Sequence, residues 1–343
     1  MSPKLRKINL ARYDLSGLRV LVTGANTGVG WDIARHYLTL CADVVYIAVR
    51  DPDKGEAAKK ALLEDYLVTR RNPRGQVHVY QLDLSSFDSV TSFCKKFCED
   101  VEILHIAVLN AGATLLDFHQ TVDGMEESFQ VNFFSNAILS AYLAPLLLSN
   151  RPSKREITYR LSTKLAAGSN FETLPSHLTW VSSTLQSESE IAKNNPIPQH
   201  ENIIDWFNER QNMSYDRWHS TKLLATAYAS ELGLRIGGED LVINSVCPGY
   251  VRSGHHKNIP FILRRLMKVF YYFFARTTAE ASIAVIWATL SSARGNAEYY
   301  SDCVIAKRVK FLRNFEGKLF QSQLWDQTQL RMRRVDEEIP VHD

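Results

Sequence analysis

A glycine-rich turn from Thr23 to Gly30 has the residue types and spacing to hold a pyrophosphate group. Its glycines would let the backbone turn tightly, let a phosphate approach the start of the next helix, and let that helix pack on a sheet. A turn of this kind without a ligand is the plain alternative, but its position between a strand-like run and a helical pattern favours the ligand. The residues predicted to bind it are Thr23, Gly24, Asn26, Thr27, Gly28, Val29 and Gly30.

Short apolar segments rich in β-branched residues alternate with amphipathic segments along most of the chain. The strand-like segments are 19–22, 43–49, 77–82, 103–109, 178–181 and 241–246. The helical segments are 30–41, 54–69, 87–98, 125–148, 218–234 and 278–290. Strands that are buried on both faces of a parallel sheet have this composition. The alternation therefore predicts an α/β fold with a doubly wound parallel sheet of the Rossmann type.

The whole chain, residues 1–343, is predicted to form a single Rossmann-type domain with its core at about residues 16–330. Two polar segments, 150–177 and 185–212, fit neither pattern and are expected to be extended loops. Loops of this length are uncommon inside compact domains unless they serve a site.

The composition favours a folded, water-soluble protein, with 45% hydrophobic and 22% charged residues. The net charge of +3 is too small to favour nucleic acid as the partner. Five scattered cysteines fit neither a disulfide framework nor a closed zinc site, so reduced thiols and no metal are expected. The N-terminus lacks the apolar stretch of a secretory signal. We therefore expect a cytoplasmic protein, either a monomer or a homodimer.

Further motifs follow in order at the ends of the predicted strands. They are Asp83-Leu84-Ser85-Ser86, Asn110-Ala111-Gly112, Asn132 in the segment VNFF, Ser182-Ser183 and Pro248-Gly249. Together with the glycine spacing TGxxxGxG, this series resembles the short-chain dehydrogenase/reductase family. Ligands of open parallel sheets bind at these strand ends. The resemblance implies contacts to a nicotinamide cofactor from Asp83, Leu84, Asn110, Ala111, Gly112, Lys222, Pro248, Gly249 and Val251.

The likeness extends to fungal members of that family related to retinol dehydrogenases. It rests on Arg276 and Glu280 at the start of the last predicted helix, and on Tyr300-Ser301-Asp302-Cys303. Such members commonly serve secondary metabolism, so the resemblance implies a role there.

Arg50 follows the second predicted strand, where enzymes that prefer NAD place an acid on the ribose 2′-hydroxyl. A cation at this place can pair with a 2′-phosphate. The resemblance therefore implies NADP(H) as the cofactor, with Lys54 as a second contact. A solvated charge at a strand end is the alternative.

In active relatives, a serine polarises the substrate carbonyl, a tyrosine transfers the proton, and a lysine four residues later lowers the tyrosine pKa and holds the ribose. An asparagine completes the proton relay. Ser183, Lys222 and Asn132 are present here, but the residue four before Lys222 is Trp218. An indole N–H donates a hydrogen bond but does not titrate in the useful range. Trp218 therefore cannot replace the acid, and a wall of the pocket is its simplest role.

Several residues are candidates for the missing proton donor. Tyr215 is predicted one helical turn before the tryptophan and on roughly the same face, although a turn of ~5.4 Å is too far for an unshifted site. His219, His255 and His256 could transfer protons near neutral pH, and a packed or surface role is the alternative for each. The run Tyr159–Lys164 has the wrong spacing and precedes the serine, so its similarity is interpreted as coincidence.

Residues from about 250 to 277 are predicted to form a lid over the substrate. The segment 259–274 is strongly apolar, with Arg264, Arg265 and Lys268 interleaved. The resemblance implies that this segment caps the substrate, and its aromatic residues favour a bulky, largely apolar small molecule. Peripheral contact of this basic segment with a membrane surface is the alternative.

Three functions remain open. The first is an NADP(H)-dependent oxidoreductase that reduces a carbonyl or oxidises an alcohol with weakened or rerouted proton transfer. The second is a non-redox enzyme on the same scaffold, catalysing cyclisation, isomerisation or elimination. The third is a cofactor-binding regulatory protein without chemistry. The retained Ser183, Asn132 and Lys222 favour the first, whereas Trp218 beside an intact cofactor turn favours the second. Fold alone does not choose among them.

Overall fold

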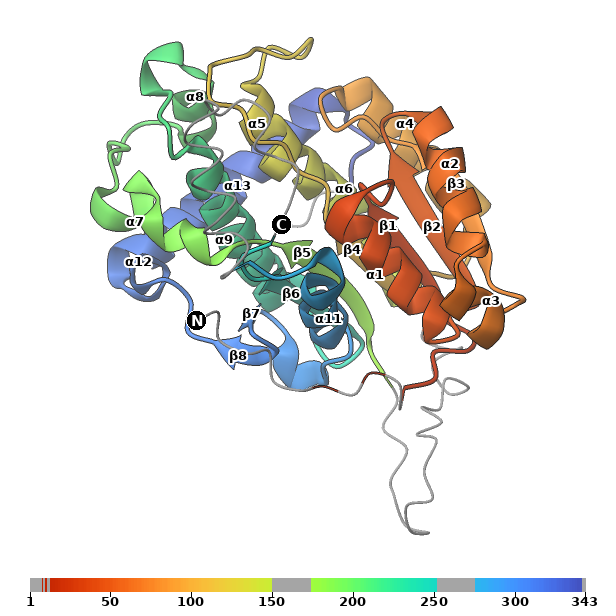
Figure 1. Ribbon diagram of the computed structural model, residues 1–343. Coiled ribbons are helices and arrows are strands. Elements are labelled where there is room, and N and C mark those ends of the chain that lie inside the picture. Colours follow the sequence, from red (N-terminus) through yellow and green to blue (C-terminus); the bar gives the residue numbers. More distant parts are fainter. Residues whose placement is uncertain (1–7, 9, 11–12, 150–173, 252–274, 341–343) are drawn as a thin grey trace, which may run out of the picture.

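The computed structural model describes residues 8, 10, 13–149, 174–251 and 275–340. Its eight-stranded sheet has the order β3-β2-β1-β4-β5-β6-β7-β8 (Figure 1). Neighbouring strands are parallel except β7 and β8, which are antiparallel. The strands are β1 (Arg19–Thr23), β2 (Val44–Val49), β3 (Gln76–Gln81), β4 (Ile106–Leu109), β5 (Ser176–Val181), β6 (Leu241–Cys247), β7 (Tyr299–Ser301) and β8 (Val304–Ala306). The predicted doubly wound α/β sheet is confirmed.

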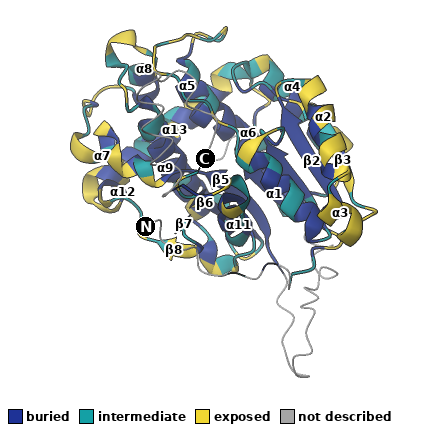
Figure 2. Cartoon of the chain, in the orientation of Figure 1, coloured by how far each residue is buried: buried dark blue, intermediate teal, exposed yellow. Residues whose placement is uncertain are grey.

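The inner strands are buried on both faces, which explains their nearly continuous apolar sequences. Every residue of β2, β4, β5 and β6 is buried (Figure 2). The edge strand β3 instead exposes Gln76, His78 and Gln81 while burying Val77. Because β1, β4, β5 and β6 are parallel neighbours, their carboxyl ends lie along one edge of the sheet. The chain order reverses between β1 and β4.

Helices cover both faces of the sheet, so the core consists of two apolar layers. One layer packs α1, α2 and α11 on the sheet, and Figure 1 shows α1 and α11 side by side. The other packs α4, α6, α9 and α13. The α-helices are α1 (Gly28–Thr39), α2 (Pro52–Leu63), α3 (Tyr66–Arg71), α4 (Phe87–Asp100), α5 (Glu127–Phe129), α6 (Ser135–Ser149), α7 (Glu190–Asn194), α8 (Ile203–Asn208), α9 (Arg217–Ile236), α11 (Thr278–Ala288), α12 (Lys310–Arg313) and α13 (Phe315–Val335). The π-helix is η2 (Gln130–Phe134), and the 3-10 helices are η4 (Thr184–Glu188), η5 (Arg210–Asn212) and η7 (Ala293–Gly295).

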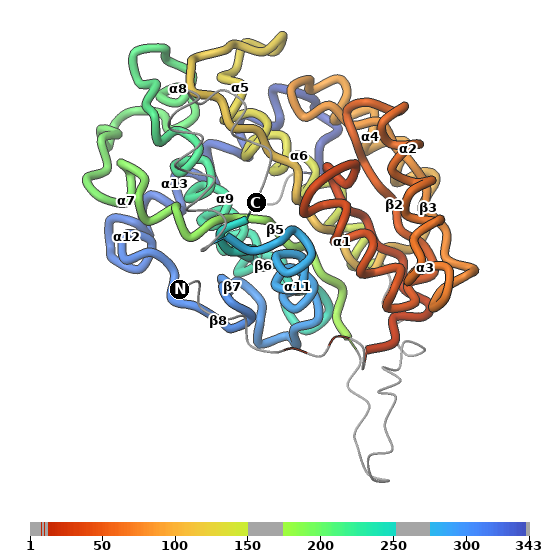
Figure 3. Tube along the Cα trace, viewed as in Figure 1, coloured from red at the N-terminus to blue at the C-terminus, as the bar shows by residue number. Residues whose placement is uncertain are grey.

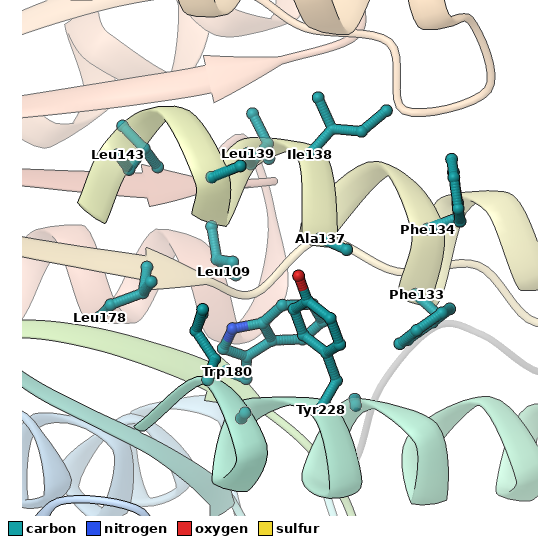
Figure 4. Close-up of a cluster of buried hydrophobic side chains, with 14 of the residues drawn as sticks. Leu109, Phe133, Phe134, Ala137, Ile138, Leu139, Leu143, Leu178, Trp180 and Tyr228 are labelled. Carbon is teal, nitrogen blue, oxygen red and sulfur yellow. The ribbon is translucent and has the colours of Figure 1, made fainter. Parts of the chain in front are cut away.

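Helix α9 is packed between the sheet and α13. In the cluster of Figure 4, Trp180 of β5 lies against Tyr228 of α9, with ring centroids 5.6 Å apart. Trp325 of α13 stacks on Tyr228 at 5.3 Å. Gln329 Nε2 donates to the Tyr228 hydroxyl at 3.1 Å, which satisfies the buried phenol.

The polar segment after β5 is folded, which corrects the prediction of an extended loop at 185–212. It forms η4, α7, α8 and η5, and Figure 3 shows it on the same side of the molecule as α12 and α13. Ile203, Ile204 and Phe207 of α8 are buried. Asn202 caps α8 by accepting hydrogen bonds from two backbone N–H groups. Helices this short contain less than two turns, so no helical periodicity develops in the sequence. Most of the other predicted loop, 150–177, lies outside the described residues.

The last two strands, β7 and β8, were not predicted. They form a hairpin whose two-residue turn, Asp302 and Cys303, has φ of +53° and +62°. Both central residues of a type I′ turn need positive φ, and this turn achieves it without glycine. Each strand has only three residues, which is too short for a strand pattern to be recognised in the sequence.

The segment 127–149 is helical throughout, through α5, η2 and α6, as predicted for 125–148. By length and composition it is the one described helix that could cross a membrane. However, 78% of its most apolar part is buried inside the protein, as in the core helix of a soluble protein.

Candidate active site

The glycine turn between β1 and α1 has the tight backbone conformation that its sequence predicts. Gly24 and Gly28 have φ of +67° and +63°, which residues with side chains rarely adopt. A Cβ on Gly30 would lie 2.4 Å from the carbonyl oxygen of Gly24, so the helix and turn approach too closely for any side chain. A Cβ on Gly28 would meet no atom within 4 Å. The turn is therefore open above Gly28, where α1 begins and its N–H groups can receive a phosphate.

Thr23 and Asn110 join the ends of β1 and β4 below this turn. The Thr23 hydroxyl oxygen accepts from the backbone N–H groups of Asn110 and Ala111, both at 3.0 Å. Asn110 Nδ2 donates to the Thr23 carbonyl at 2.9 Å. Each side chain therefore binds the backbone at the end of the other strand, which helps to hold the glycine turn in shape. Direct contact of either with a cofactor stays a prediction.

The residues predicted for the adenosine side lie at the ends of β2 and β3. Arg50 is exposed and has no ion pair among the described residues. Lys54 Nζ lies 2.6 Å from Asp51 Oδ2, so its charge is already matched. Asp51 also caps α2 by accepting from the N–H groups of Asp53 and Lys54. Sequence reasoning overlooked Asp51, although Asp before Pro at a helix start is a common capping signal.

Asp83 and Leu84 follow β3, and their polar atoms are used within the fold. The Asp83 carboxylate accepts from Ser85 N at 2.9 Å and from Ser85 Oγ at 2.6 Å. The Leu84 carbonyl accepts from the Ser135 hydroxyl at 2.6 Å. These bonds shape a loop that is predicted to contact the cofactor.

Asn132 lies in the π-helix η2, a local irregularity that is frequent at functional sites. Its Nδ2 donates to the Ala113 carbonyl at 2.8 Å and to Thr221 Oγ1 at 3.1 Å. Its Oδ1 accepts from Ala113 N at 2.7 Å. The side chain therefore fixes the loop after β4 against α9.

Lys222 of α9 is brought to the same place. A Cβ on Gly112 would lie 2.9 Å from Asn132 Oδ1 and 3.6 Å from Lys222 Nζ, so three predicted site residues converge. Lys222 Nζ donates to the Val181 carbonyl at the end of β5, at 2.8 Å. Burial lowers the pKa of Lys222 to about 8, because desolvation disfavours the ammonium form, and Cys247 opposes this shift.

Ser183 lies directly after β5 and is 8% exposed. Its hydroxyl oxygen accepts from Leu185 N at 3.2 Å and caps η4. The next residue, Thr184, donates its N–H to Cys247 Sγ of β6 at 3.2 Å. Lys222 thus joins α9 to the end of β5, and Thr184 joins the residues after β5 to Cys247 of β6.

Trp218 is the second residue of α9 and stands on the same face as Lys222, whose Nζ is 5.9 Å from the indole centroid. Among the described residues the indole N–H has no hydrogen-bond partner, and its backbone carbonyl accepts from Thr221 Oγ1 at 2.8 Å. The prediction that Tyr215 shares this face is wrong. Helix α9 begins at Arg217, so Tyr215 lies outside the helix and is 92% exposed.

His219 is half-buried, and its ring meets that of Trp218 edge-on, with centroids 5.6 Å apart. Burial lowers its pKa, while the carboxylates of Asp216 and Glu188 act in the opposite direction. Burial therefore favours the neutral form of the ring. The other histidine candidates, His255 and His256, and the run 159–164 lie outside the described residues.

Pro248, Gly249 and Val251 follow β6, and Arg276 holds this stretch. Gly249 has φ of +86°, and a Cβ there would lie 2.2 Å from Arg276 Nη1. Arg276 Nη1 donates to the Pro248 carbonyl at 3.3 Å, and Nη2 pairs with the Asp302 carboxylate. Val251 pairs with Arg276 in an isolated parallel bridge. Residues 252–274 of the predicted lid lie outside the described residues.

Sequence reasoning missed a group of buried polar side chains behind Ser183. Tyr299 of β7 lies near Gln186 and Cys247. Burial raises the pKa of its phenol, and both neighbours also influence that pKa. Neither the Tyr299 hydroxyl nor either polar atom of the Gln186 side chain has a well-formed hydrogen bond within the described part of the chain. No spacing motif links residues so far apart, so the sequence carried no signal for them. In the same part of the chain, no three metal-ligating side chains come together.

Comparisons with known proteins agree with the predicted family. A family model described as short chain dehydrogenase matches residues 19–155. A short chain dehydrogenase of Arthrobotrys oligospora is 42% identical over 340 residues, which cover 99% of this chain and 99% of that protein. The short chain dehydrogenase yanD of Aspergillus niger is 28% identical over 324 residues, which cover 94% and 93%.

One similar solved structure is an active-site complex of Pseudomonas aeruginosa RhlG with NADP. Its TM-score is 0.56 at 21% identity, and the match covers 85% of this chain and 96% of that one. A likeness at this level of identity shows a shared fold.

Proposed function

Because the chain belongs to the short-chain dehydrogenase family, we propose that it is an NADP(H)-dependent oxidoreductase acting on a bulky, largely apolar metabolite. The proposed reaction is reduction of a carbonyl group or oxidation of an alcohol. The main support for this proposal is that Asn132 and Lys222 converge on Gly112. Trp218 stands beside them, at the position where active relatives have the tyrosine acid. The retained site argues for hydride chemistry, and the tryptophan argues for a changed proton route.

The glycine turn and Arg50 support NADP(H) as the cofactor. The turn leaves space above Gly28 for a pyrophosphate, and Arg50 is exposed and unpaired among the described residues. Arg50 can therefore form charge-assisted hydrogen bonds with a 2′-phosphate. The RhlG structure contains NADP, which is consistent with this choice.

We expect Arg50→Ala to weaken NADPH binding by about tenfold or more, because a hydrogen bond to a charged group contributes roughly 1.5–3 kcal/mol. NADH affinity should stay unchanged, since NADH lacks the 2′-phosphate. Calorimetric titration of both cofactors tests this, with Lys60→Ala on the exposed face of α2 as the matched control. Equal affinities of the wild-type protein for NADPH and NADH would contradict the proposal.

The chain's own residues would perform the remaining steps of the reaction. The nicotinamide, when bound, supplies hydride to the carbonyl carbon or accepts it from the alcohol. Ser183 can donate its hydroxyl proton in a hydrogen bond to the substrate oxygen. Lys222, with a pKa of about 8, can give that oxygen its proton in place of the absent tyrosine. Trp218 provides a flat apolar wall beside this ammonium.

Fungal secondary metabolism is the proposed setting. The relatives described above come from fungi, and the family likeness includes members with such roles. A flat indole next to Lys222 suits a large apolar substrate better than a small polar one.

Absorbance of the reduced nicotinamide during turnover tests the reaction class. We expect one NADPH consumed for each alcohol formed from a panel of bulky apolar ketones, with no consumption in the Gly28→Val variant. Product formed without any change in that absorbance would instead support the non-redox alternative.

A further inference from the structure

A buried arginine lies directly before Trp218. Arg217, the first residue of α9, is 1% exposed. Its guanidinium lies over the ring of Phe207 at 4.5 Å and over that of Trp206 at 5.6 Å. Its Nη2 donates to the Asn212 carbonyl at 2.7 Å. Among the described residues, its Nε and Nη1 have no well-formed hydrogen bond, although such buried donors are normally satisfied.

The carboxylate of Glu126 faces this arginine and is itself fully buried. Arg217 Nε and Glu126 Oε2 are 3.8 Å apart. The two carboxylate oxygens also accept from Ser128 N at 2.9 Å and from Phe129 N at 2.8 Å. Glu126 therefore caps α5, the helix that continues into η2 and carries Asn132.

Stability alone does not account for this pair. Arg217 sits at the positive end of the α9 dipole, where a cation is unfavourable. Burying both charges is costly, and apolar residues of similar shape often serve as well or better. Burial lowers the pKa of Arg217 and raises that of Glu126, so both groups resist their charged forms. A costly pair at this position needs another role.

Among the described residues, the pair is one of two polar connections between α9 and the helix of Asn132, which also meet through the rings of Tyr228 and Phe133. The second runs from Asn132 Nδ2 to Thr221 Oγ1, which in turn donates to the Trp218 carbonyl. One connection lies just before Trp218 and the other three residues after it. We propose that Arg217 and Glu126 form a positioning pair that sets where the Trp218 indole stands relative to Lys222. The proposal rests on the active site proposed above but not on its reaction.

The segment between η4 and α9 supports the same role. Asn208 of α8 accepts from the backbone N–H of Glu126 at 2.8 Å, and the Asn212 carbonyl accepts from Arg217. Trp206 and Phe207 cover the guanidinium. This segment thus contacts both members of the pair and holds them together.

Fluorine NMR of protein labelled with 5-fluorotryptophan tests the proposal without cofactor or substrate. The chain has six tryptophans, and Trp218→Phe assigns the resonance of interest. Glu126→Gln keeps the shape of the side chain and lies far from Trp218 in sequence. We expect Glu126→Gln to shift the Trp218 resonance in the otherwise unchanged protein. In the Arg217→Met background, adding Glu126→Gln should leave that resonance unmoved.

The opposite end of α9 provides a matched control. Arg235 pairs with Glu231 at 3.1 Å and lies over the ring of Trp325 at 4.8 Å, a more exposed group of arginine, carboxylate and aromatic ring away from the site. Arg235→Met should shift the Trp325 resonance and leave that of Trp218 in place.

Two results would overturn the proposal. One is a Trp218 resonance that Glu126→Gln does not move, and the other is an equal shift in both backgrounds. If Arg217→Met fails to fold, Arg217→Gln replaces it, because a glutamine removes the charge that faces Glu126 but keeps an N–H donor. In turnover, Glu126→Gln should lower kcat by roughly tenfold to a hundredfold, the effect of misplaced reacting groups, while KM for NADPH stays unchanged. An equal rise in KM for NADPH would indicate general loosening and would also overturn it.

Discussion

The hydrogen bonds of the polar groups around Trp218 do not involve its side chain. Lys222 Nζ donates to the Val181 carbonyl, and the Asn132 amide binds Ala113 and Thr221. Trp218 contributes only its backbone carbonyl to this set of hydrogen bonds. The side chains predicted for a family-type proton transfer are therefore held in place, apart from the acid.

We expect Trp218→Tyr to raise NADPH-dependent reduction of a bulky apolar ketone by up to ~10²–10⁴, the usual contribution of a positioned acid. The phenol would stand near an ammonium whose charge lowers the phenol pKa. Steady-state rates with saturating NADPH measure the gain.

Trp218→Phe is the control for that substitution, because it removes the indole and keeps an aromatic ring without a hydroxyl. A gain shared equally by both variants would come from the extra space rather than from acid catalysis. Loss of the native reaction in both variants, with no gained reduction, would instead assign the indole a direct part in a non-redox reaction.

Lys222 should make the stability of the protein depend on pH. Its pKa is about 8 in the folded state against an ordinary 10.5, a difference that corresponds to about 3 kcal/mol. Below pH 8 both folded and unfolded states carry the proton, so the folded state bears the full cost of the buried charge. Between pH 8 and 10.5 the unfolded state binds more protons, and stability rises with pH. Relative to Lys222→Met, the wild-type protein should therefore gain up to about 3 kcal/mol over this window.

Urea denaturation at several pH values checks this expectation. Lys60→Met, at a lysine that is 75% exposed, should run parallel to the wild-type protein across the same range. A constant difference between wild type and Lys222→Met from pH 7 to pH 10.5 would show that Lys222 titrates normally.

At the level of elements, the β1–α1 turn and the π-helix η2 place the two halves of the site. The turn brings the start of α1 beneath the space above Gly28. The π-helix places Asn132 between the loop after β4 and α9. Each element departs from regular geometry at the residue that the site needs.

Gly28→Val should abolish cofactor binding while the protein still folds. A valine there must adopt a φ near +63°, at a cost of roughly 1–2 kcal/mol, and its branches would occupy the space left for phosphate. Gly17 has φ of +86° and an equally open Cβ position, but it lies before β1. Gly17→Val should therefore lose similar stability and keep full NADPH affinity, as calorimetry and thermal unfolding can show. Normal binding by Gly28→Val would mean that the turn holds no phosphate.

The sequence predicts well those elements whose pattern extends over several residues. The six strands β1 to β6 and the glycine turn follow from apolar runs and glycine spacing, which report burial and backbone conformation directly. The strands β7 and β8 and the helices of 184–212 were missed because each is too short for periodicity. The Arg217–Glu126 pair was missed because charged residues usually face solvent, and nothing in the spacing brings residue 217 to residue 126.

At the scale of the whole molecule, α13 completes the core by covering α9. Trp325 of α13 is 1% exposed and touches both Tyr228 and Arg235 of α9. The predicted site lies at the start of α9, whereas these contacts lie in its second half. The C-terminal helix therefore supports the scaffold without touching the reacting groups.

Trp325→Ala should destabilise the protein by about 3–5 kcal/mol, because it removes a large buried ring and leaves a cavity. NADPH affinity of the folded fraction should not change. Phe315→Ala, at an 85% exposed position of the same helix, should cost less than about 0.5 kcal/mol. Chemical denaturation and cofactor titration measure both quantities. Loss of cofactor affinity in Trp325→Ala under folding conditions would show that α13 reaches the site.

The isolation of the Trp218 indole from the surrounding hydrogen bonds has an evolutionary consequence. The codons for tryptophan and tyrosine differ at more than one nucleotide, and the shortest route between them that avoids a stop codon passes through cysteine. Within the described part of the chain, no side-chain hydrogen bond would be broken by any residue along that route. Selection at this position can therefore act on the reaction alone, and a lineage can exchange one chemistry for another without first repairing the scaffold.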